Sequence, residues 1–189
     1  MEVHQAMRTS YLSHDILKCF FICISPLPHI LSYLLLLRRL QLRKINESCF
    51  PVTYNASFYD DMAKKTDENL CKFAYWNGFA VGNICTRVEP LPDSPGRSRI
   101  YIMTLGVLAA YRNHGIGSKL VQSVLDYFEE QKDGKFSTVD EIMLHVQTSN
   151  TDAIKFYGEK FGFEKGELVE NYYKRIDPPH CYVLRKKLR

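Results

Sequence analysis

A short glycine-containing segment, Arg112–Ser118, has the residue types and spacing needed to hold an anion. It lies between an expected strand, Arg99–Val107, and an expected amphipathic helix, Ser118–Gln131. Glycines let the backbone approach a ligand closely. The unpaired amide N–H groups at a helix start favour negative charge. A pyrophosphate is the natural guest of such a loop, and the alternative is a plain loop whose glycines serve steric needs.

Two common phosphate-binding motifs do not fit this segment. The Gly-Lys-Ser/Thr ending of a P-loop is missing, and the dinucleotide pattern G-x-G-x-x-G fails at Leu120. The segment alone therefore does not identify a ligand, and the elements around it must be considered.

Tyr101 and His145 are polar residues inside two expected strands, each with apolar neighbours on both sides. Side chains alternate between the faces of a strand, so each polar group lies on the face opposite its neighbours. For His145 alone, this pattern favours a histidine whose hydrogen bonds are satisfied within the core.

Hydrophobic periodicity and turn signals place these residues in one mixed α/β sheet. Asn77-Gly78 predicts a hairpin turn, and Asn150 is a good N-cap for the helix that follows it. Helices are expected at 40–46, 54–65, 118–131 and 152–161, and strands at 70–76, 79–88, 99–107, 141–147, 163–175 and 181–188.

Residues 16–37 are mostly apolar but contain two prolines, a lysine and a histidine. We favour a strand at 19–24 followed by a helix from His29. The alternatives are a membrane anchor and a weakly structured extension. The residues that argue against a continuous span are Lys18, Pro26, Pro28 and His29, and those that would mark its cytoplasmic side are Arg38, Arg39, Arg43 and Lys44.

Composition excludes several other classes of protein. The 189 residues suffice for one domain, and the net charge of +4 is concentrated in residues 174–189, which hold six Lys/Arg and one acid. The near-neutral remainder argues against general nucleic-acid binding. The six cysteines include no Cys-x-x-Cys pair, so we expect reduced thiols rather than a zinc site.

The context of the glycine segment resembles the GNAT acetyltransferases. Its Arg-x-x-Gly-x-Gly pattern follows a strand and precedes a helix, a strand and a second helix led by Asn150. In that superfamily the loop wraps the pyrophosphate of acetyl-CoA. The residues from Asn150 through Phe156-Tyr157 to Phe161-Gly162-Phe163 resemble the second signature of the superfamily.

Four further stretches resemble one group within it, the NatE-type N-alpha-acetyltransferase 50 (San) family. They are Phe50–Asn55, Tyr101–Gly106, Leu144–Gln147 and Asn171–Ile176. The resemblance implies a GNAT domain at 40–189, preceded by an atypical apolar segment at 1–39. It also implies that the loop Glu130–Asp140 is longer than is usual in the family.

The family implies roles for several of these residues. Tyr101 and His145 would hold the water that removes a proton from the amine, and Tyr157 would protonate the leaving thiolate unless it is a packing aromatic. The residues that would bind acetyl-CoA are Leu105, Val107, Arg112, Asn113, His114, Gly115, Ile116, Gly117, Ser118, Asn150 and Tyr157. Those that would line the peptide site are Phe50, Pro51, Val52, Tyr54, Met103, Tyr172, Tyr173 and Ile176.

The implied function is transfer of an acetyl group from acetyl-CoA, without a metal, to the α-amino group of proteins that begin with Met and an apolar residue. Implied partners are the auxiliary and catalytic subunits of a NatA-type complex and the ribosome, in the cytoplasm and also the nucleus. The alternatives are a non-catalytic subunit of such a complex and a protein lysine acetyltransferase.

Overall fold

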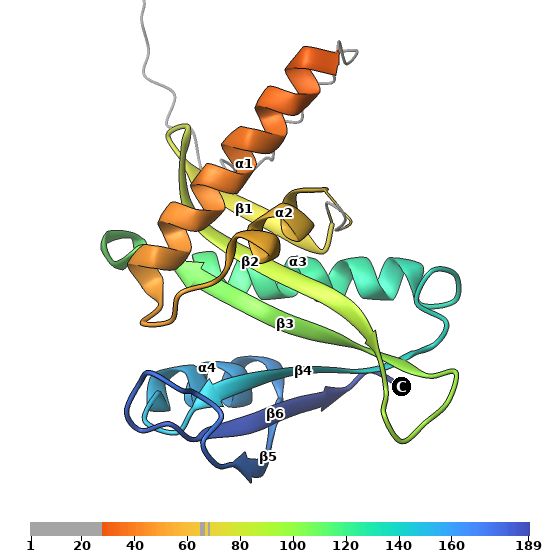
Figure 1. Ribbon diagram of the computed structural model, residues 1–189. Coiled ribbons are helices and arrows are strands. Elements are labelled where there is room, and N and C mark those ends of the chain that lie inside the picture. Colours follow the sequence, from red (N-terminus) through yellow and green to blue (C-terminus); the bar gives the residue numbers. More distant parts are fainter. Residues whose placement is uncertain (1–27, 65–66, 68) are drawn as a thin grey trace, which may run out of the picture.

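The computed structural model describes residues 28–64, 67 and 69–189, which form one sheet with helices on both faces (Figure 1). The expected strand at 19–24 lies outside these residues. The helices are α1 (Pro28–Cys49), α2 (Ala56–Lys64), η1 (Ala109–Tyr111, a 3₁₀ turn), α3 (Ile116–Gln131) and α4 (Thr151–Phe161). The strands are β1 (Cys71–Trp76), β2 (Phe79–Pro90), β3 (Ser98–Val107), β4 (Val139–Gln147), β5 (Glu164–Val169) and β6 (Cys181–Lys187).

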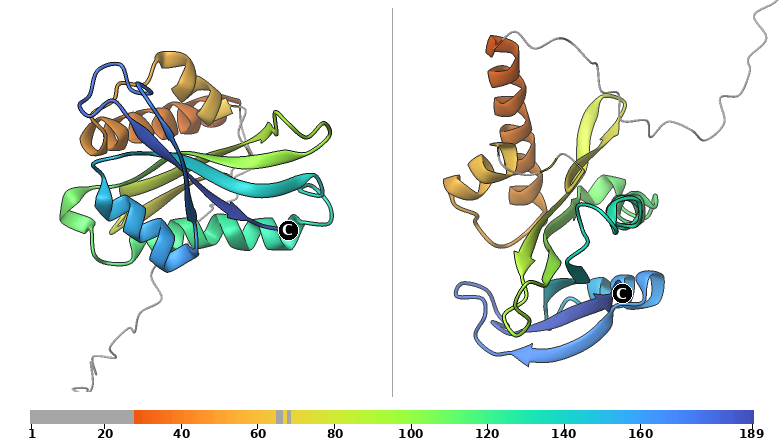
Figure 2. Two further views of the ribbon diagram at one scale, coloured as in Figure 1. Left: turned by 90° about the horizontal axis from the view of Figure 1, so that it is seen from below. Right: turned by 90° about the vertical axis from the view of Figure 1, so that its right-hand side faces the viewer.

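The sheet has six strands in the order β1-β2-β3-β4-β6-β5. All neighbours are antiparallel except β3 and β4, which are parallel. The predicted mixed sheet, and the order of elements along the chain, are confirmed. Helices α1 and α2 cover one face and α3 and α4 the other, as the view from below shows (Figure 2).

Two apolar clusters hold these layers together. The larger one joins α3 and α4 to the sheet through residues such as Phe128 and Ile142, both 0% exposed. The smaller one joins α1 and α2 to β1 and β2 through Leu42, Ile45 and Tyr59. Apolar contacts therefore fix helices to both faces of the sheet, with α1 and α2 packed over its β1–β2 side.

Strands β3 and β4 pair over only part of their length. Their ladder runs from Ser98 opposite Val139 to Tyr101 opposite Met143. Beyond this point β3 pairs only with β2, and β4 only with β6, so the two strands diverge (Figure 1). The edge of β3 from Ile102 to Val107 therefore presents backbone groups toward the opening between the strands.

Two elements differ from the sequence prediction by more than two residues. The helix expected from His29 and the helix expected at 40–46 form one element, α1. It runs without a break from Pro28 across the predicted domain boundary at residue 40, because a proline at the first helical position loses no hydrogen bond and has a suitable φ. Among the described residues, no helix has the length and apolar character that crossing a membrane requires.

The strand expected at 163–175 is also too long. Strand β5 ends at Val169, and Asn171 has a left-handed φ of 54° that turns the chain into a loop. This loop closes on itself where the Tyr173 amide donates to the Pro179 carbonyl at 2.8 Å. The aromatic residues at 172 and 173 therefore lie in a loop, and tertiary contacts override their strand propensity.

Candidate active site

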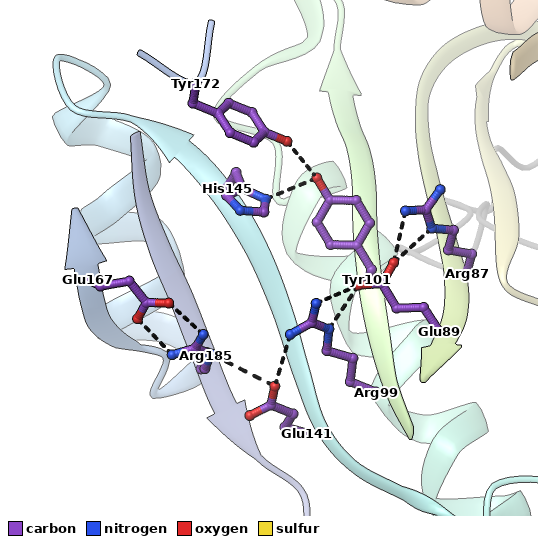
Figure 3. Close-up of polar contacts among 9 residues, drawn as sticks. All are labelled: Arg87, Glu89, Arg99, Tyr101, Glu141, His145, Glu167, Tyr172 and Arg185. Carbon is purple, nitrogen blue, oxygen red and sulfur yellow. Dashed lines mark hydrogen bonds and ion pairs between the residues drawn. The ribbon is translucent and has the colours of Figure 1, made fainter. Parts of the chain in front are cut away.

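Tyr101 and His145 meet at the point where β3 and β4 separate (Figure 3). The Tyr101 hydroxyl lies 3.1 Å from His145 Nδ1 and 3.4 Å from the Tyr172 hydroxyl. The Tyr172 ring stacks on the imidazole with centroids 4.4 Å apart and planes at 16°. The alternation of the two strands and a loop that follows β5 thus bring three sequence-predicted residues into one cluster.

This surrounding sets the protonation states of the cluster. Burial and the hydrogen bond to Tyr172 raise the pKa of Tyr101 well above its usual value, so the phenol keeps its proton. Burial, aided by Arg99, lowers the pKa of His145 below 6.5, so the imidazole is neutral at physiological pH. A neutral imidazole accepts a proton at its unprotonated nitrogen, which suits His145 to act as a base.

The predicted anion loop leads directly into α3. Gly115 occupies the N-cap position with a left-handed φ of 75°, and no side chain caps the helix. The first-turn amides of Ile116, Gly117 and Ser118 consequently have no acceptor within the helix. This start of a helix can bind the phosphates of a nucleotide through backbone N–H groups and the helix dipole.

Hydrogen bonds hold the rest of the loop beside the open edge of β3. Arg112 Nε donates to the Val107 carbonyl at 3.0 Å, and His114 Nδ1 donates to the Arg112 carbonyl at 2.7 Å. Asn113 adopts a left-handed φ of 64°. Together with Leu105 and Val107 on the open edge, the loop could hold an extended thioester cofactor and its pyrophosphate.

Two predicted cofactor residues lie on α4. The Asn150 side chain accepts the Ala153 amide at 3.2 Å, so it caps the helix as expected. Tyr157 is 4% exposed and packs edge-on against Phe156 and Phe163. Burial raises the pKa of Tyr157, so its phenol carries a proton. The Tyr157 ring also belongs to the core.

Aromatic side chains form a wall on the α1–α2 side of the cluster. Tyr54 stacks on Phe58 with centroids 4.6 Å apart and meets Phe50 edge-on at 6.2 Å. Burial raises the pKa of Tyr54 to about 12, and the nearby Tyr172 contributes to this rise. The α1–α2 connection and the β5–β6 loop therefore face each other across the cluster.

The other predicted peptide-site residues follow this arrangement. Met103 lies at a bulge of β3, since Cys85 opposes Thr104 and Thr86 opposes Ile102, and it shares a face with Tyr101. Pro51 and Val52 lie on the α1–α2 connection, and Tyr173 and Ile176 on the β5–β6 loop. Tyr173 meets Tyr172 edge-on at 4.9 Å.

A charged row beside the cluster was missed at the sequence level. It comprises Arg87, Glu89, Arg99, Glu141, Glu167 and Arg185 (Figure 3). The sequence indicates only that some of these residues share a strand face with the cluster, because Arg99 stands two residues before Tyr101 and Glu141 four before His145. The pairing of strands that assembles the row cannot be deduced from these spacings.

Comparisons with known proteins identify relatives of this chain. The model of the acetyltransferase (GNAT) family matches residues 39–163. The chain is 50% identical over 149 residues to N-alpha-acetyltransferase 50 of Danio rerio, covering 79% of this chain and 82% of that protein.

Solved structures share the fold. Arabidopsis thaliana Naa50 in complex with the bisubstrate analogue CoA-Ac-MVNAL aligns with a TM-score of 0.66 and 47% identity, over 78% of this chain and 90% of that one. A chain of the NatC complex bound to Gag peptide and CoA aligns with a TM-score of 0.69 and 25% identity, over 80% and 91%.

Proposed function

Because this chain belongs to the acetyltransferase (GNAT) family and has its fold, we propose that the Tyr101–His145 cluster transfers the acetyl group of acetyl-CoA to protein N-termini. The 50% identity to an N-alpha-acetyltransferase supports the same conclusion, and the chain is an acetyl-CoA-dependent N-terminal acetyltransferase. The observation that carries the assignment to this site is the 3.1 Å contact between Tyr101 and His145 at the end of the β3–β4 ladder.

The reaction needs a neutral amine beside the thioester carbonyl. An α-amino group has a pKa of about 8, so a modest base can deprotonate it. In our proposal His145 and Tyr101 hold a water that passes this proton on to the His145 imidazole, the amine nitrogen bonds to the acetyl carbon, and the carbon–sulfur bond breaks. Tyr157 supplies a proton to the departing thiolate. The strand edge and the start of α3 contribute by holding the thioester against the amine.

We further propose that the substrate begins with Met followed by an apolar residue. The aromatic and aliphatic wall around Phe50, Pro51, Val52 and Met103 suits an apolar side chain, and Tyr172, Tyr173 and Ile176 lie across from it on the opposing loop. The analogue bound to Arabidopsis Naa50 carries a peptide that starts Met-Val, which supports this choice.

A panel of peptides that differ only in their first two residues tests this specificity. We expect the highest kcat/KM for Met-Leu and Met-Val peptides, and at least tenfold lower values for Ser- and Ala-initiated ones. Equal rates across the panel, or a preference for an acidic second residue, would contradict the proposed apolar site.

Truncating the wall should weaken peptide binding selectively. We expect Phe50→Ala to raise the KM for a Met-Leu peptide by about tenfold, since lost burial of one apolar contact costs roughly 1.4 kcal/mol. Steady-state kinetics would check this, with the KM for acetyl-CoA unchanged. Phe79→Ala is the matched control, because Phe79 is 72% exposed at the β1–β2 turn. An equal rise in both variants would argue against a role for Phe50.

The pKa of His145 predicts the pH dependence. Only the neutral imidazole accepts a proton, and burial lowers the pKa of His145 below 6.5. The rate therefore falls as the pH drops through that lowered pKa. We expect the kcat/KM profile to have an acid limb with its midpoint below pH 6.5, and His145→Ala to lose this limb. A midpoint above 6.5, or the same limb without the imidazole, would oppose the assignment.

We propose that the enzyme works in the cytoplasm, and also in the nucleus, with NatA-type subunits at the ribosome. The likeness to a subunit of the NatC complex supports assembly with other chains. Co-purification of the full-length chain with ribosomes and NatA subunits tests this, and recovery of the chain alone would count against it.

A further inference from the structure

Arg99 lies between two carboxylates next to the Tyr101–His145 cluster (Figure 3). Glu89 on β2 and Glu141 on β4 stand opposite it in register. Arg99 Nε and Nη2 each lie 2.8 Å from Glu89 Oε1, and Nη1 lies 3.8 Å from Glu141 Oε1. Only 16% of the Arg99 side chain is exposed. The guanidinium is therefore held from both sides and shielded from solvent.

The row continues to both edges of this face. Arg87 Nη2 lies 2.8 Å from Glu89 Oε2, and its guanidinium carbon is 5.2 Å from the centre of the Tyr101 ring. At the other end Arg185 contacts Glu167 at 2.6 and 2.7 Å. Positive and negative groups alternate and balance, so removal of any one leaves an uncompensated charge near the site.

A change of charge in this row affects the His145 imidazole through the protein interior. Arg99 shares a face with Tyr101, and Glu141 shares a face with His145. Met143, between Glu141 and His145, is only 2% exposed, so the space between the row and the imidazole contains protein rather than bulk water. Charges separated by protein interact more strongly than charges separated by water.

We propose that Arg99 is a positioning residue that keeps His145 in its neutral, proton-accepting form, and that Glu89 limits this effect. The inference rests on the proposed function, in which His145 is the proton acceptor. Burial lowers the pKa of His145 most, Arg99 lowers it further, and Glu89 and Glu167 oppose them. The charged and titratable groups on the elements around His145 are Arg87, Glu89, Arg99, Tyr101, Glu141, Glu167, Arg185, Tyr172 and Tyr173.

Titration of the His145 imidazole by NMR tests this without catalysis. The signal is assigned by its absence from His145→Ala in the full-length chain. Arg99→Gln removes a positive charge, so we expect the midpoint to rise by at least about half a pH unit, the size Coulomb's law gives at several ångströms in water. Glu89→Gln removes a negative charge and should lower the midpoint by a similar amount. The double variant should return close to the native value, and Arg99→Lys should stay near it.

Arg97→Gln is the matched control. It breaks the Arg97–Asp140 ion pair, which lies outside the row, and should leave the midpoint unchanged. Circular dichroism confirms that each variant is folded. Midpoints that stay fixed, or that move in the same direction in Arg99→Gln and Glu89→Gln, would overturn the proposal. Opposite shifts in the NMR midpoint that the kcat/KM profile does not follow would support the role of Arg99 and instead contradict His145 as the base.

Discussion

Replacing Tyr101 with Phe, or His145 with Ala, is expected to lower kcat/KM by at least about 10²-fold, the usual contribution of general-base catalysis. Each change removes one member of the 3.1 Å contact that would hold the water. The KM for acetyl-CoA should change little, because neither side chain belongs to the loop that starts α3. Stopped assays of CoA release with a Met-Leu peptide would measure the effect.

Tyr182→Phe is the matched control for the loss of a phenol. Tyr182 lies on β6 and packs against the hydrophobic core on the other face of the sheet. Its ring contacts Lys165 rather than the Tyr101–His145 cluster. Its loss should leave kcat/KM within about twofold of the native value, a change of less than about 0.5 kcal/mol. Full activity in both Tyr101→Phe and His145→Ala would rule out the proposed proton transfer and favour a non-catalytic role.

Substituting Gly115 with Val should raise the KM for acetyl-CoA by about tenfold or more. Gly115 has a φ of 75°, and a left-handed conformation costs a residue with a Cβ roughly 1–2 kcal/mol. Val is β-branched and fits it worst. To relieve the strain, the loop must rotate the amides that lead into α3, and these are the groups we assign to the pyrophosphate.

Gly96 provides a control with the same backbone strain at another place. Its φ is 80°, and it lies in the β2–β3 connection, away from α3. Gly96→Val should cost similar stability in thermal unfolding and leave the KM for acetyl-CoA unchanged. If both variants weaken acetyl-CoA binding equally, the effect of Gly115 is one of general stability.

Local sequence rules predicted the parts of the site that depend on one element at a time. Strand alternation placed each of Tyr101 and His145 on the face opposite its apolar neighbours, and the glycines of Arg112–Ser118 marked the start of α3, which begins two residues earlier than expected. Both features are encoded within about ten residues. The same holds for the Asn150 cap, which the structure confirms.

Features that depend on contacts between distant elements were not predictable in this way. The strand propensity of Tyr172 and Tyr173 suggested a strand, whereas the loop is fixed by bonds such as that from Gln147 Nε2 to the Pro178 carbonyl. The position of Arg99 between Glu89 and Glu141 depends on the register of three strands. No spacing along the chain specifies that register.

The most direct test is a competition between the two kinds of amine in one peptide. A Met-Leu peptide that also contains an internal lysine would be incubated with the full-length chain and acetyl-CoA, and mass spectrometry would locate the acetyl group. Our account predicts that the group appears on the α-amino nitrogen, and that a copy with a blocked N-terminus is left unmodified. Acetylation of the lysine, or no transfer to any free N-terminus, would contradict it.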